Sequence, residues 1–468
     1  MPRVTAIGDL TARLQMATVQ VGESLGWKGS AMKRACSRRA FLAGSAVGAM
    51  GIGLATRAVG AEGVPPADTI SMGFIGVGGM GSGNLTAFAA HKDVRVSAIC
   101  DVNAPRREAV VKRFEATAKG HHDFREVLDR KDVDAVMIAT PPHWHAIMAV
   151  QAAKAGKDFY VEKPMTLYVA ESQAVVKAAR EHNRVTQVGT QIHAGANYRR
   201  VVEIVRAGVI GTVNLVRTFN VMNQTRAGVG KAPANAPVPA GLDWDMFLGP
   251  LPMRPFNPII VASSYHHCSF MDISGGWLPG MAPHIMDLPV WALDLPLPSQ
   301  VSCAGGRFII DDDGDAPEVQ ECLFRYPGLV MTWMHNLANS YGFDFHGAGG
   351  MARRLGIYFH GEKATLHTDY GTHKIIPEAD PKAVLELPGP SLPPTPGHHR
   401  ELLDAIKTRQ QPSCNVAYHH RVNVPICLAN LSYKLGRSVQ FDPVKETVIG
   451  DEAAARLLAP SYREPWAL

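Results

Sequence analysis

Three features that reveal the class of many proteins are missing from this sequence. No two of its seven cysteines stand in a Cys-x-x-Cys spacing, the pattern of zinc sites and of thiol–disulfide redox motifs. The apolar, glycine-rich run at 43–55 is too short to span a membrane. No segment repeats along the chain. What remains is an ordinary globular composition, and 468 residues with 46% hydrophobic content suffice for two or three domains with a sizeable core.

Excess charge of one sign is also missing from most of the chain. The formal net charge is +5, but residues 1–61 hold eight Lys and Arg against only two acidic residues. This N-terminal part therefore carries +6, and the remainder of the chain carries −1. A body so close to neutrality gives no electrostatic reason to expect a nucleic-acid partner.

The basic N-terminal part has the layout of a twin-arginine export signal. Ser37–Leu42 reads SRRAFL, the apolar run at 43–55 follows it, and 59–61 supplies the small residues of a cleavage site. A basic linker beside an apolar helix is the alternative. We expect translation to start at Met32, since residues 1–31 contribute nothing to such a signal. The prediction is a periplasmic or secreted protein that the twin-arginine machinery exports folded, without a stable membrane anchor.

The strongest pattern in the sequence is a strand, a glycine-rich turn and a helix. Residues 70–75 form a short apolar run typical of a buried parallel strand. Gly76, Gly78 and Gly81 follow in the spacing G-x-G-x-x-G, and a second strand pattern ends at Asp101. In a dinucleotide site the glycines allow a tight turn, a close approach of the pyrophosphate and close helix–strand packing. The N-terminus of the helix then binds the phosphates, and the acid binds a ribose hydroxyl. A glycine-rich turn in an unrelated α/β domain is the alternative.

The acidic residue at the end of the second strand favours NAD over NADP. The carboxylate of Asp101 would repel a 2′-phosphate. Arg106 and Arg107 follow soon after and could accept that phosphate, so NADP stays possible. The predicted cofactor-binding residues come from the glycine-rich turn and from the ends of later strands: Gly76, Gly78, Gly79, Met80, Gly81, Asp101, Thr140, Pro141, His145, Glu162 and Lys163.

The order of strand and helix patterns predicts an α/β fold with two folded domains. Strands alternate with helices over 68–190, which predicts a doubly wound parallel sheet of six strands, a Rossmann domain. Strand patterns without intervening helices dominate the start of 191–468, which predicts an α+β domain with a largely antiparallel sheet. This second domain is expected to bind the substrate and to form a homo-oligomer through its sheet. Residues 1–61 form the signal region.

Several motifs together resemble the glucose–fructose oxidoreductase / inositol dehydrogenase (Gfo/Idh/MocA) family. The resemblance covers essentially everything after residue 68. Besides the turn at Gly76–Gly81 and the strand-end Asp101, it rests on TPPHWH (140–145), EKP (162–164), YRRVVEIVRAGVIG (198–211) and SGGWLPGMAPHIMD (274–287). It implies an NAD(P)-dependent oxidoreductase that acts on the CH–OH group of a sugar, polyol or glycoside.

The EKP element places a lysine at the end of a strand of the sheet. Lys163 can contact both the nicotinamide ribose and a substrate hydroxyl, and can move the proton that accompanies hydride transfer. Glu162 is expected to orient its ammonium group, and a cis peptide before Pro164 is plausible. His145 is expected to cap the following helix and to line the nicotinamide end. A surface ion pair is the alternative for Lys163.

Two further candidate catalytic residues lie three positions apart, on one face of a predicted helix. His284 is a candidate general base, and Asp287 is expected to orient it or to bind a sugar hydroxyl. Family members usually carry Asp four positions before this histidine, but here that position is Gly280. Either His284 works without that acid or the chemistry differs; a buried core histidine or a substrate-binding histidine is the alternative.

No metal site is predicted from ligand spacing along the chain. The adjacent pairs His266–His267, His398–His399 and His419–His420 lack recognised metal-ligand spacing, and neighbouring side chains in a strand point to opposite faces. A twin-arginine substrate folds in the reducing cytoplasm, so its cysteines are expected to be mostly free and buried.

Two other functions stay open at this point. A redox-neutral glycosidase or lyase would oxidise a ring hydroxyl transiently and then return the hydride, but the Tyr-Pro-Thr-His arrangement of that branch is not found. A sugar-binding relative without catalysis would account for Gly280. The sequence does not name the carbohydrate.

Overall fold

The computed structural model describes residues 68–343 and 354–468. The chain divides into two units, Met1–Arg57 and Ala58–Leu468. The first unit lies outside the described residues, and so does the whole predicted export signal. Among the described residues, no helix combines the length and the apolar character that a membrane crossing needs. All six cysteines in this part of the chain are free thiols, as expected.

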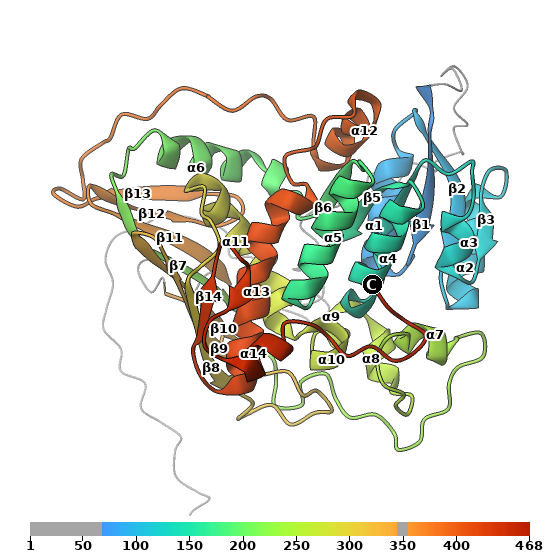
Figure 1. Cartoon of the computed structure of the whole chain (residues 1–468). Coiled ribbons are helices and arrows are strands. Elements are labelled where there is room, and N and C mark those ends of the chain that lie inside the picture. Colours follow the sequence, from blue (N-terminus) through green and yellow to red (C-terminus); the bar gives the residue numbers. More distant parts are fainter. Residues whose placement is uncertain (1–67, 344–353) are drawn as a thin grey trace, which may run out of the picture. The chain divides into compact units, whose positions relative to one another are not determined.

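The first sheet is the predicted six-stranded parallel sheet (Figure 1). Its strand order, β3-β2-β1-β4-β5-β6, is that of a doubly wound fold whose order reverses at β1. The strands are β1 (Ile70–Ile75), β2 (Val94–Cys100), β3 (Lys119–His121), β4 (Ala135–Ile138), β5 (Asp158–Glu162) and β6 (Thr186–Gly189). Nearly every residue of β1, β2, β4, β5 and β6 is buried, because helices cover both faces.

The two faces of this sheet are covered by different helices. One core packs against α3 (Phe124–Leu128), α4 (His145–Lys154) and α5 (Val169–Glu181). The other packs against α1 (Gly79–Ala89), α2 (Ala104–Val111) and, unexpectedly, α12 (His398–Thr408), which comes from the C-terminal part of the chain. Short helical turns lie at Lys112–Phe114 and Pro142–Trp144. The segment around α12 therefore belongs to the first core, although the sequence placed it in the second domain.

The second sheet has nine strands and is mostly antiparallel. Its order is β13-β12-β11-β7-β10-β9-β8-β14-β15, and β7 and β10 pair in parallel. The strands are β7 (Val213–Val221), β8 (Gln300–Gly306), β9 (Val319–Tyr326), β10 (Leu329–Asn336), β11 (Leu355–Gly361), β12 (Ala364–Thr368), β13 (His373–Pro377), β14 (Val439–Asp442) and β15 (Thr447–Val448). Alternate residues of β9 are buried and exposed, which shows that one face of this sheet is covered and the other is open.

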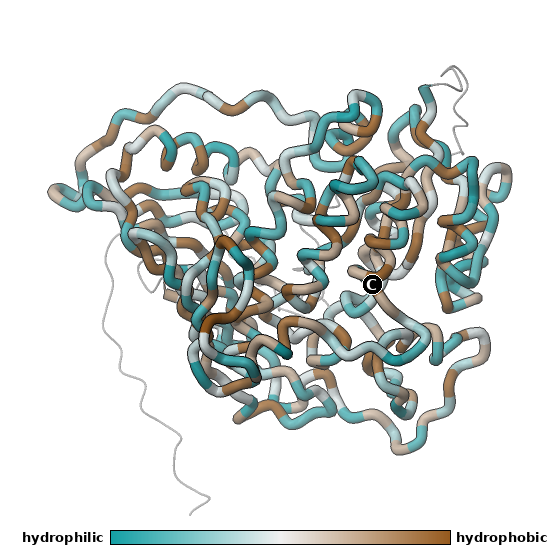
Figure 2. Tube along the Cα trace, in the orientation of Figure 1, coloured by the Kyte–Doolittle hydropathy of each residue, from teal (hydrophilic) through white to brown (hydrophobic). Residues whose placement is uncertain are grey.

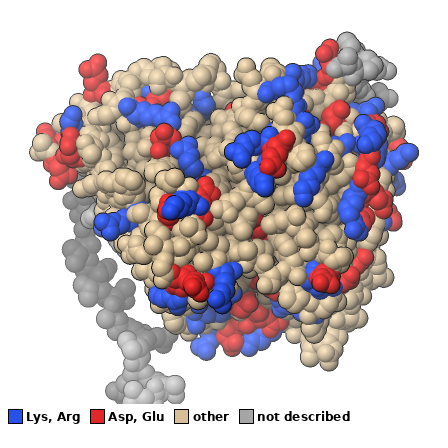
Figure 3. Space-filling view, viewed as in Figure 1, with Lys and Arg blue, Asp and Glu red and all other residues tan. Residues whose placement is uncertain are grey.

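Three long helices cover the buried face of the second sheet. These are α6 (Ala196–Arg206), α11 (Trp277–Ala292) and α13 (Val416–Leu435), and they share one apolar core with the strands. The shorter elements are the turn η5 (Gln191–Ala194) and the helices α7 (Trp244–Leu248), α8 (Pro258–Ala262), α9 (Ser264–His267), α10 (Met271–Ser274) and α14 (Glu452–Arg456). Apolar residues concentrate along the inner strands and helices (Figure 2). Figure 3 shows acidic and basic residues interspersed over one face of the protein.

Candidate active site

The glycine-rich turn joins β1 to α1, and two of its glycines are required by packing. Gly76 has a φ of +80°, and a Cβ atom there would lie 2.7 Å from the backbone of Ala139. A Cβ atom on Gly81 would overlap the carbonyl oxygen of Gly76. The first glycine thus makes the tight turn and the third lets α1 pack closely on β1, as the sequence predicted.

The middle of the turn is open. A Cβ atom on Gly78 would meet only the guanidinium of Arg106, at 3.7 Å, and one on Gly79 would meet nothing within 4 Å. Helix α1 starts at Gly79 without a side-chain cap, so its first N–H groups stay available, and Met80 beside them is exposed. Free N–H groups at a helix N-terminus bind phosphate well. The turn therefore fits the pyrophosphate of a dinucleotide.

Asp101 holds the turn against the end of β2. Its Oδ2 accepts a hydrogen bond from the backbone N–H of Val77 (3.0 Å), and its Oδ1 accepts one from Asn103 (2.9 Å). The guanidinium of Arg106 lies 3.7 Å from the carboxylate. Asp101 and Arg106 thus stand together beside Gly78, where the adenosine ribose of a dinucleotide binds in this fold.

His145 holds the loop after β4 in place through hydrogen bonds to two carbonyl oxygens. Nδ1 of His145 lies 2.7 Å from the carbonyl oxygen of Pro164, and Nε2 lies 2.9 Å from that of Thr140. His145 is fully buried and is itself the first residue of α4, which has no side-chain cap. The expectation that His145 caps this helix is therefore wrong. It joins the loop at Thr140–Pro141 to the EKP element, and burial lowers its pKa.

Glu162 is buried and accepts four hydrogen bonds. Its Oε1 accepts from the side chains of Asn84 (2.8 Å), Tyr160 (3.1 Å) and Gln191 (2.9 Å), and its Oε2 accepts from the backbone N–H of Lys163 (3.1 Å). None of the donors is the ammonium group of Lys163, so the predicted role of Glu162 in orienting that group is wrong. The carboxylate instead fixes the backbone at the end of β5.

Lys163 reaches from the first domain to helix α11 of the second. Its Nζ donates a hydrogen bond to the carbonyl oxygen of Gly280 (2.8 Å), and its peptide bond to Pro164 is cis, as expected. The lysine therefore lies at the carboxyl edge of the parallel sheet, where ligands bind in doubly wound folds.

His284 follows Gly280 by one turn of α11, close to Lys163. Burial lowers the pKa of His284 well below its ordinary value, and the nearby charge of Lys163 lowers it further. The imidazole is therefore neutral at neutral pH. Its Nδ1 is buried and has no hydrogen-bond partner within 68–343 and 354–468, whereas the side chain as a whole is partly exposed.

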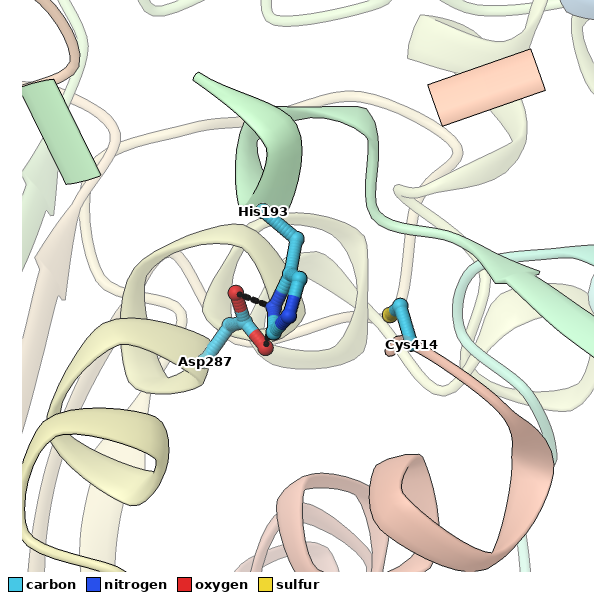
Figure 4. A group of neighbouring side chains, drawn as sticks. All are labelled: His193, Asp287 and Cys414. Carbon is cyan, nitrogen blue, oxygen red and sulfur yellow. Dashed lines mark hydrogen bonds and ion pairs between the residues drawn. The ribbon is translucent and has the colours of Figure 1, made fainter. Parts of the chain in front are cut away.

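Asp287 lies on the same helix but does not contact His284 through a hydrogen bond. Its carboxylate is fully buried and binds Nδ1 of His193 (2.9 Å; Figure 4). It also accepts a hydrogen bond from the hydroxyl of Tyr418 (2.6 Å). The predicted role of Asp287 in orienting His284 or binding a sugar hydroxyl is therefore wrong. His284 and Asp287 do lie three positions apart on one helix, as predicted. The hydrogen-bond partners of Asp287, however, come from distant parts of the chain.

Two residues near Lys163 were not predicted as site residues. The thiol of Cys268 lies where a side chain at position 280 would project, and burial raises its pKa to about 11. Burial also lowers the pKa of the neighbouring His267 to about 3. In the sequence His267 stood out only as part of the pair His266–His267, and no spacing connected either residue to Lys163.

Comparison with known proteins decides the family. Residues 70–190 match the profile described as "Oxidoreductase family, NAD-binding Rossmann fold", and residues 195–303 and 346–468 match "Oxidoreductase family, C-terminal alpha/beta domain". The chain belongs to the Gfo/Idh/MocA oxidoreductase family. Its first domain is the NAD-binding Rossmann domain of that family, with the glycine-rich turn and Asp101 in the positions described above.

Curated relatives resemble only part of the chain. A glycosyl hydrolase family 109 protein of Shewanella pealeana is 32% identical over 157 residues, 32% of this chain and 34% of the relative. An inositol 2-dehydrogenase of Salmonella paratyphi B is 32% identical over 145 residues, 31% of this chain and 43% of the relative. The aligned part thus spans between a third and a half of these relatives.

Solved Gfo/Idh/MocA-like structures share the fold over most of the chain. A levoglucosan dehydrogenase in complex with NADH has a TM-score of 0.57 at 20% identity, over 80% of this chain and 99% of that one. The aldose–aldose oxidoreductase of Caulobacter crescentus has a TM-score of 0.57 at 16% identity, over 80% of this chain and 100% of that one. At these identities the likeness concerns the fold.

Proposed function

We propose that the protein is an NAD-dependent oxidoreductase that transfers hydride between nicotinamide and a CH–OH carbon of a sugar, polyol or glycoside. One observation carries the proposal: Nζ of Lys163 lies 2.8 Å from the Gly280 carbonyl, and a neutral His284 follows on the same helix. A proton-transferring amine and a neutral imidazole thus meet at the nicotinamide edge of the sheet. The levoglucosan and aldose enzymes of this fold support a carbohydrate substrate.

The side chains of this chain handle the proton. Bound NAD supplies the hydride acceptor. Lys163 takes the proton of the substrate hydroxyl while the carbonyl of Gly280 holds its Nζ in place. His284 lies beside Lys163 with a neutral imidazole and can hydrogen-bond the substrate hydroxyl. Glu162 and His145 contribute by fixing the loops around Lys163.

A panel of sugars and polyols tests the proposal. The mature protein is incubated with each compound, and NADH fluorescence and mass spectrometry of the products are recorded. We expect a two-hydrogen mass loss in a subset of substrates, and Lys163→Ala abolishes it. Binding of a sugar without any product, in the presence of NAD, would instead indicate a non-catalytic sugar-binding protein and would contradict the proposal.

A redox-neutral glycosidase is the second candidate, because curated relatives are glycosyl hydrolase family 109 proteins. Such an enzyme oxidises a ring hydroxyl only transiently and then returns the hydride. In that case aryl glycosides release the aryl alcohol without net NADH, and solvent deuterium enters the sugar beside the oxidised carbon. The dehydrogenase gives the oxidised sugar without deuterium, and NADH rises to about one equivalent per chain unless a second substrate takes the hydride.

Export and assembly extend the proposal. The basic segment before residue 62 supports twin-arginine export to the periplasm, and a variant with Arg38→Lys and Arg39→Lys should remain in the cytoplasm. The open face of the second sheet carries Leu323, 42% exposed, beside partly buried strand residues, which supports a homo-oligomer through this face. Leu323→Arg should then lower the sedimentation coefficient to that of a monomer.

A further inference from the structure

Three buried side chains of metal-ligand type meet at one point of the fold. His193 comes from η5 directly after β6, Asp287 from α11, and Cys414 from the segment just before α13 (Figure 4). One ligand atom of each lies within 4.8 Å of the other two. All three residues are almost completely buried. The cluster is invisible in the sequence, because it joins three segments that are far apart along the chain.

The imidazole of His193 is held in a fixed orientation. Its Nδ1 lies 2.9 Å from Asp287, and its ring stacks on Trp291 at a centroid distance of 3.9 Å. The hydroxyl of Tyr418 orients the carboxylate with a hydrogen bond of 2.6 Å. The other nitrogen, Nε2, is buried and has no hydrogen-bond partner in the described part of the chain. Leaving a buried nitrogen unpaired is unfavourable, and a bound ligand would remove that cost.

We propose that His193, Asp287 and Cys414 bind one divalent cation of the zinc class. An imidazole nitrogen, a carboxylate oxygen and a thiolate sulfur form a donor set typical of Zn²⁺, whereas Mg²⁺ and Ca²⁺ prefer oxygen ligands alone. The charges balance, since one carboxylate and one thiolate neutralise the dication in a buried place. On binding, the S–H bond of Cys414 breaks, a metal–sulfur bond forms, and the proton leaves to solvent.

Binding requires side-chain movement, because Asp287 now contacts Nδ1 of His193: the carboxylate leaves Nδ1 to join an ion on Nε2, or the ion replaces this contact at Nδ1. Zn–N bonds of about 2.0–2.1 Å and Zn–S bonds of about 2.3 Å imply that the three side chains close on the ion by roughly 1 Å. Three protein ligands leave a fourth position for water. The ion would connect the end of the first sheet, helix α11 and the start of α13, so we expect it to stabilise the fold. This site does not depend on the proposed hydride transfer.

Metal content and spectroscopy test the site. Full-length protein is purified without chelators, dialysed against Zn²⁺, and analysed for metal and for unfolding temperature. We expect about one zinc per chain and a higher unfolding temperature with zinc than after chelation. Replacement by Co²⁺ should give a thiolate-to-cobalt charge-transfer band. Tyr418→Phe, which removes only the orienting hydroxyl, should weaken zinc binding about 10–100-fold.

Matched cysteine variants decide between the cluster and adventitious binding. Cys414→Ala should lose the zinc, the cobalt band and the zinc-dependent stabilisation. Cys427→Ala removes another buried thiol, on α13 itself, and should keep all three. Wild-type protein without zinc, or equal zinc in Cys414→Ala, overturns the site. Turnover and bound dinucleotide are measured separately, so a zinc-loaded protein without activity would contradict the proposed function and support the site.

Discussion

The thiol of Cys268 lies 3.1 Å from the point where a Cβ atom on Gly280 would stand. The space that an aspartate at position 280 would use is therefore filled by a sulfur atom from another segment. Lys163 binds the carbonyl oxygen of the same Gly280. The glycine that stands where relatives usually have aspartate therefore lies beside both the thiol of Cys268 and the ammonium group of Lys163.

Restoring an acid at position 280 should succeed only together with a smaller residue at 268. Gly280→Asp alone forces its side chain against Cys268 and should cost about 1–3 kcal/mol of unfolding free energy. The double variant Gly280→Asp/Cys268→Ala should recover stability and change the rate or the substrate range, with Cys268→Ala alone as the control. Chemical denaturation and the sugar panel measure both effects. Equal stability of the single and double variants would show that the two positions do not meet.

Lys163→Ala should abolish turnover while the fold and the bound dinucleotide survive. In the proposed mechanism the amine takes the substrate proton, so its loss should reduce kcat about 10²–10⁴-fold. Lys154→Ala, on the exposed side of α4, is the matched control. Steady-state kinetics and the dinucleotide content after gel filtration are recorded. Wild-type rates in Lys163→Ala would exclude the lysine from the mechanism.

The acid at the end of β2 should set the cofactor preference. In Asp101→Asn the charged acceptor for the ribose hydroxyls is lost, which should weaken NAD binding about 10–100-fold. The same change removes the repulsion of a 2′-phosphate and frees the guanidinium of Arg106, so NADP binding should improve. Adding Arg106→Ala should cancel that gain. Titration calorimetry with both dinucleotides gives the Kd values, and an unchanged NAD/NADP ratio would contradict the assignment.

The cofactor should be retained through repeated turnover. If the protein is exported folded, as proposed, NAD is loaded in the cytoplasm, and the enzyme then has no obvious supply of free dinucleotide. A residence time of days at an ordinary association rate corresponds to a Kd well below about 1 nM. Protein from the periplasm should therefore carry close to one dinucleotide per chain after long dialysis, by mass spectrometry. An empty protein that depends on added NAD would argue against both retention and export.

Buried Glu171 should make stability depend on pH. Burial raises its pKa to about 7, although it accepts hydrogen bonds from Tyr462 (2.5 Å) and from two backbone N–H groups. The folded state then keeps a proton on Glu171 that the unfolded state releases near pH 4.5. The contribution of Glu171 to the free energy of unfolding therefore falls as the pH rises from 4.5 to 7 and is constant above pH 7. The loss is about 3 kcal/mol. Glu171→Gln should lack it, whereas Glu181→Gln, at the exposed end of α5, should keep it. Urea unfolding at several pH values measures the difference.

The sequence predicted those parts of the fold that local patterns determine. The strands β1 and β2 are apolar runs with clear ends, and the glycine-rich turn has a steric signature that needs no partner. Strand β3 was not located, because its three residues Lys119–His121 have no apolar pattern and pair only at the edge of the sheet. The parallel pairing of β7 with β10 was also not predicted, because the pattern within a strand does not show which strand it pairs with.

The sequence predicted where the site residues lie in the fold, but it did not predict which side chains they contact. The placement of Lys163 follows from the strand that precedes it, and the helix that carries His284 and Asp287 follows from its spacing. The partners of Glu162 and Asp287 do not, because Asn84, His193 and Tyr418 reach them only through the tertiary fold. These contacts join residues 78, 94 and 131 positions apart, and such contacts leave no trace in local periodicity.

The place of α12 in the first core has a consequence for the order of synthesis and folding. Leu402 and Leu403 are fully buried in that core, and His399 lies 3.0 Å from the Asn84 side chain on α1. The nucleotide-binding domain therefore lacks part of its interior until about six sevenths of the chain have left the ribosome. Until then its apolar surface stays exposed to chaperones and to aggregation. A ribosome-bound fragment ending before residue 398 should be far more sensitive to protease than one that includes α12.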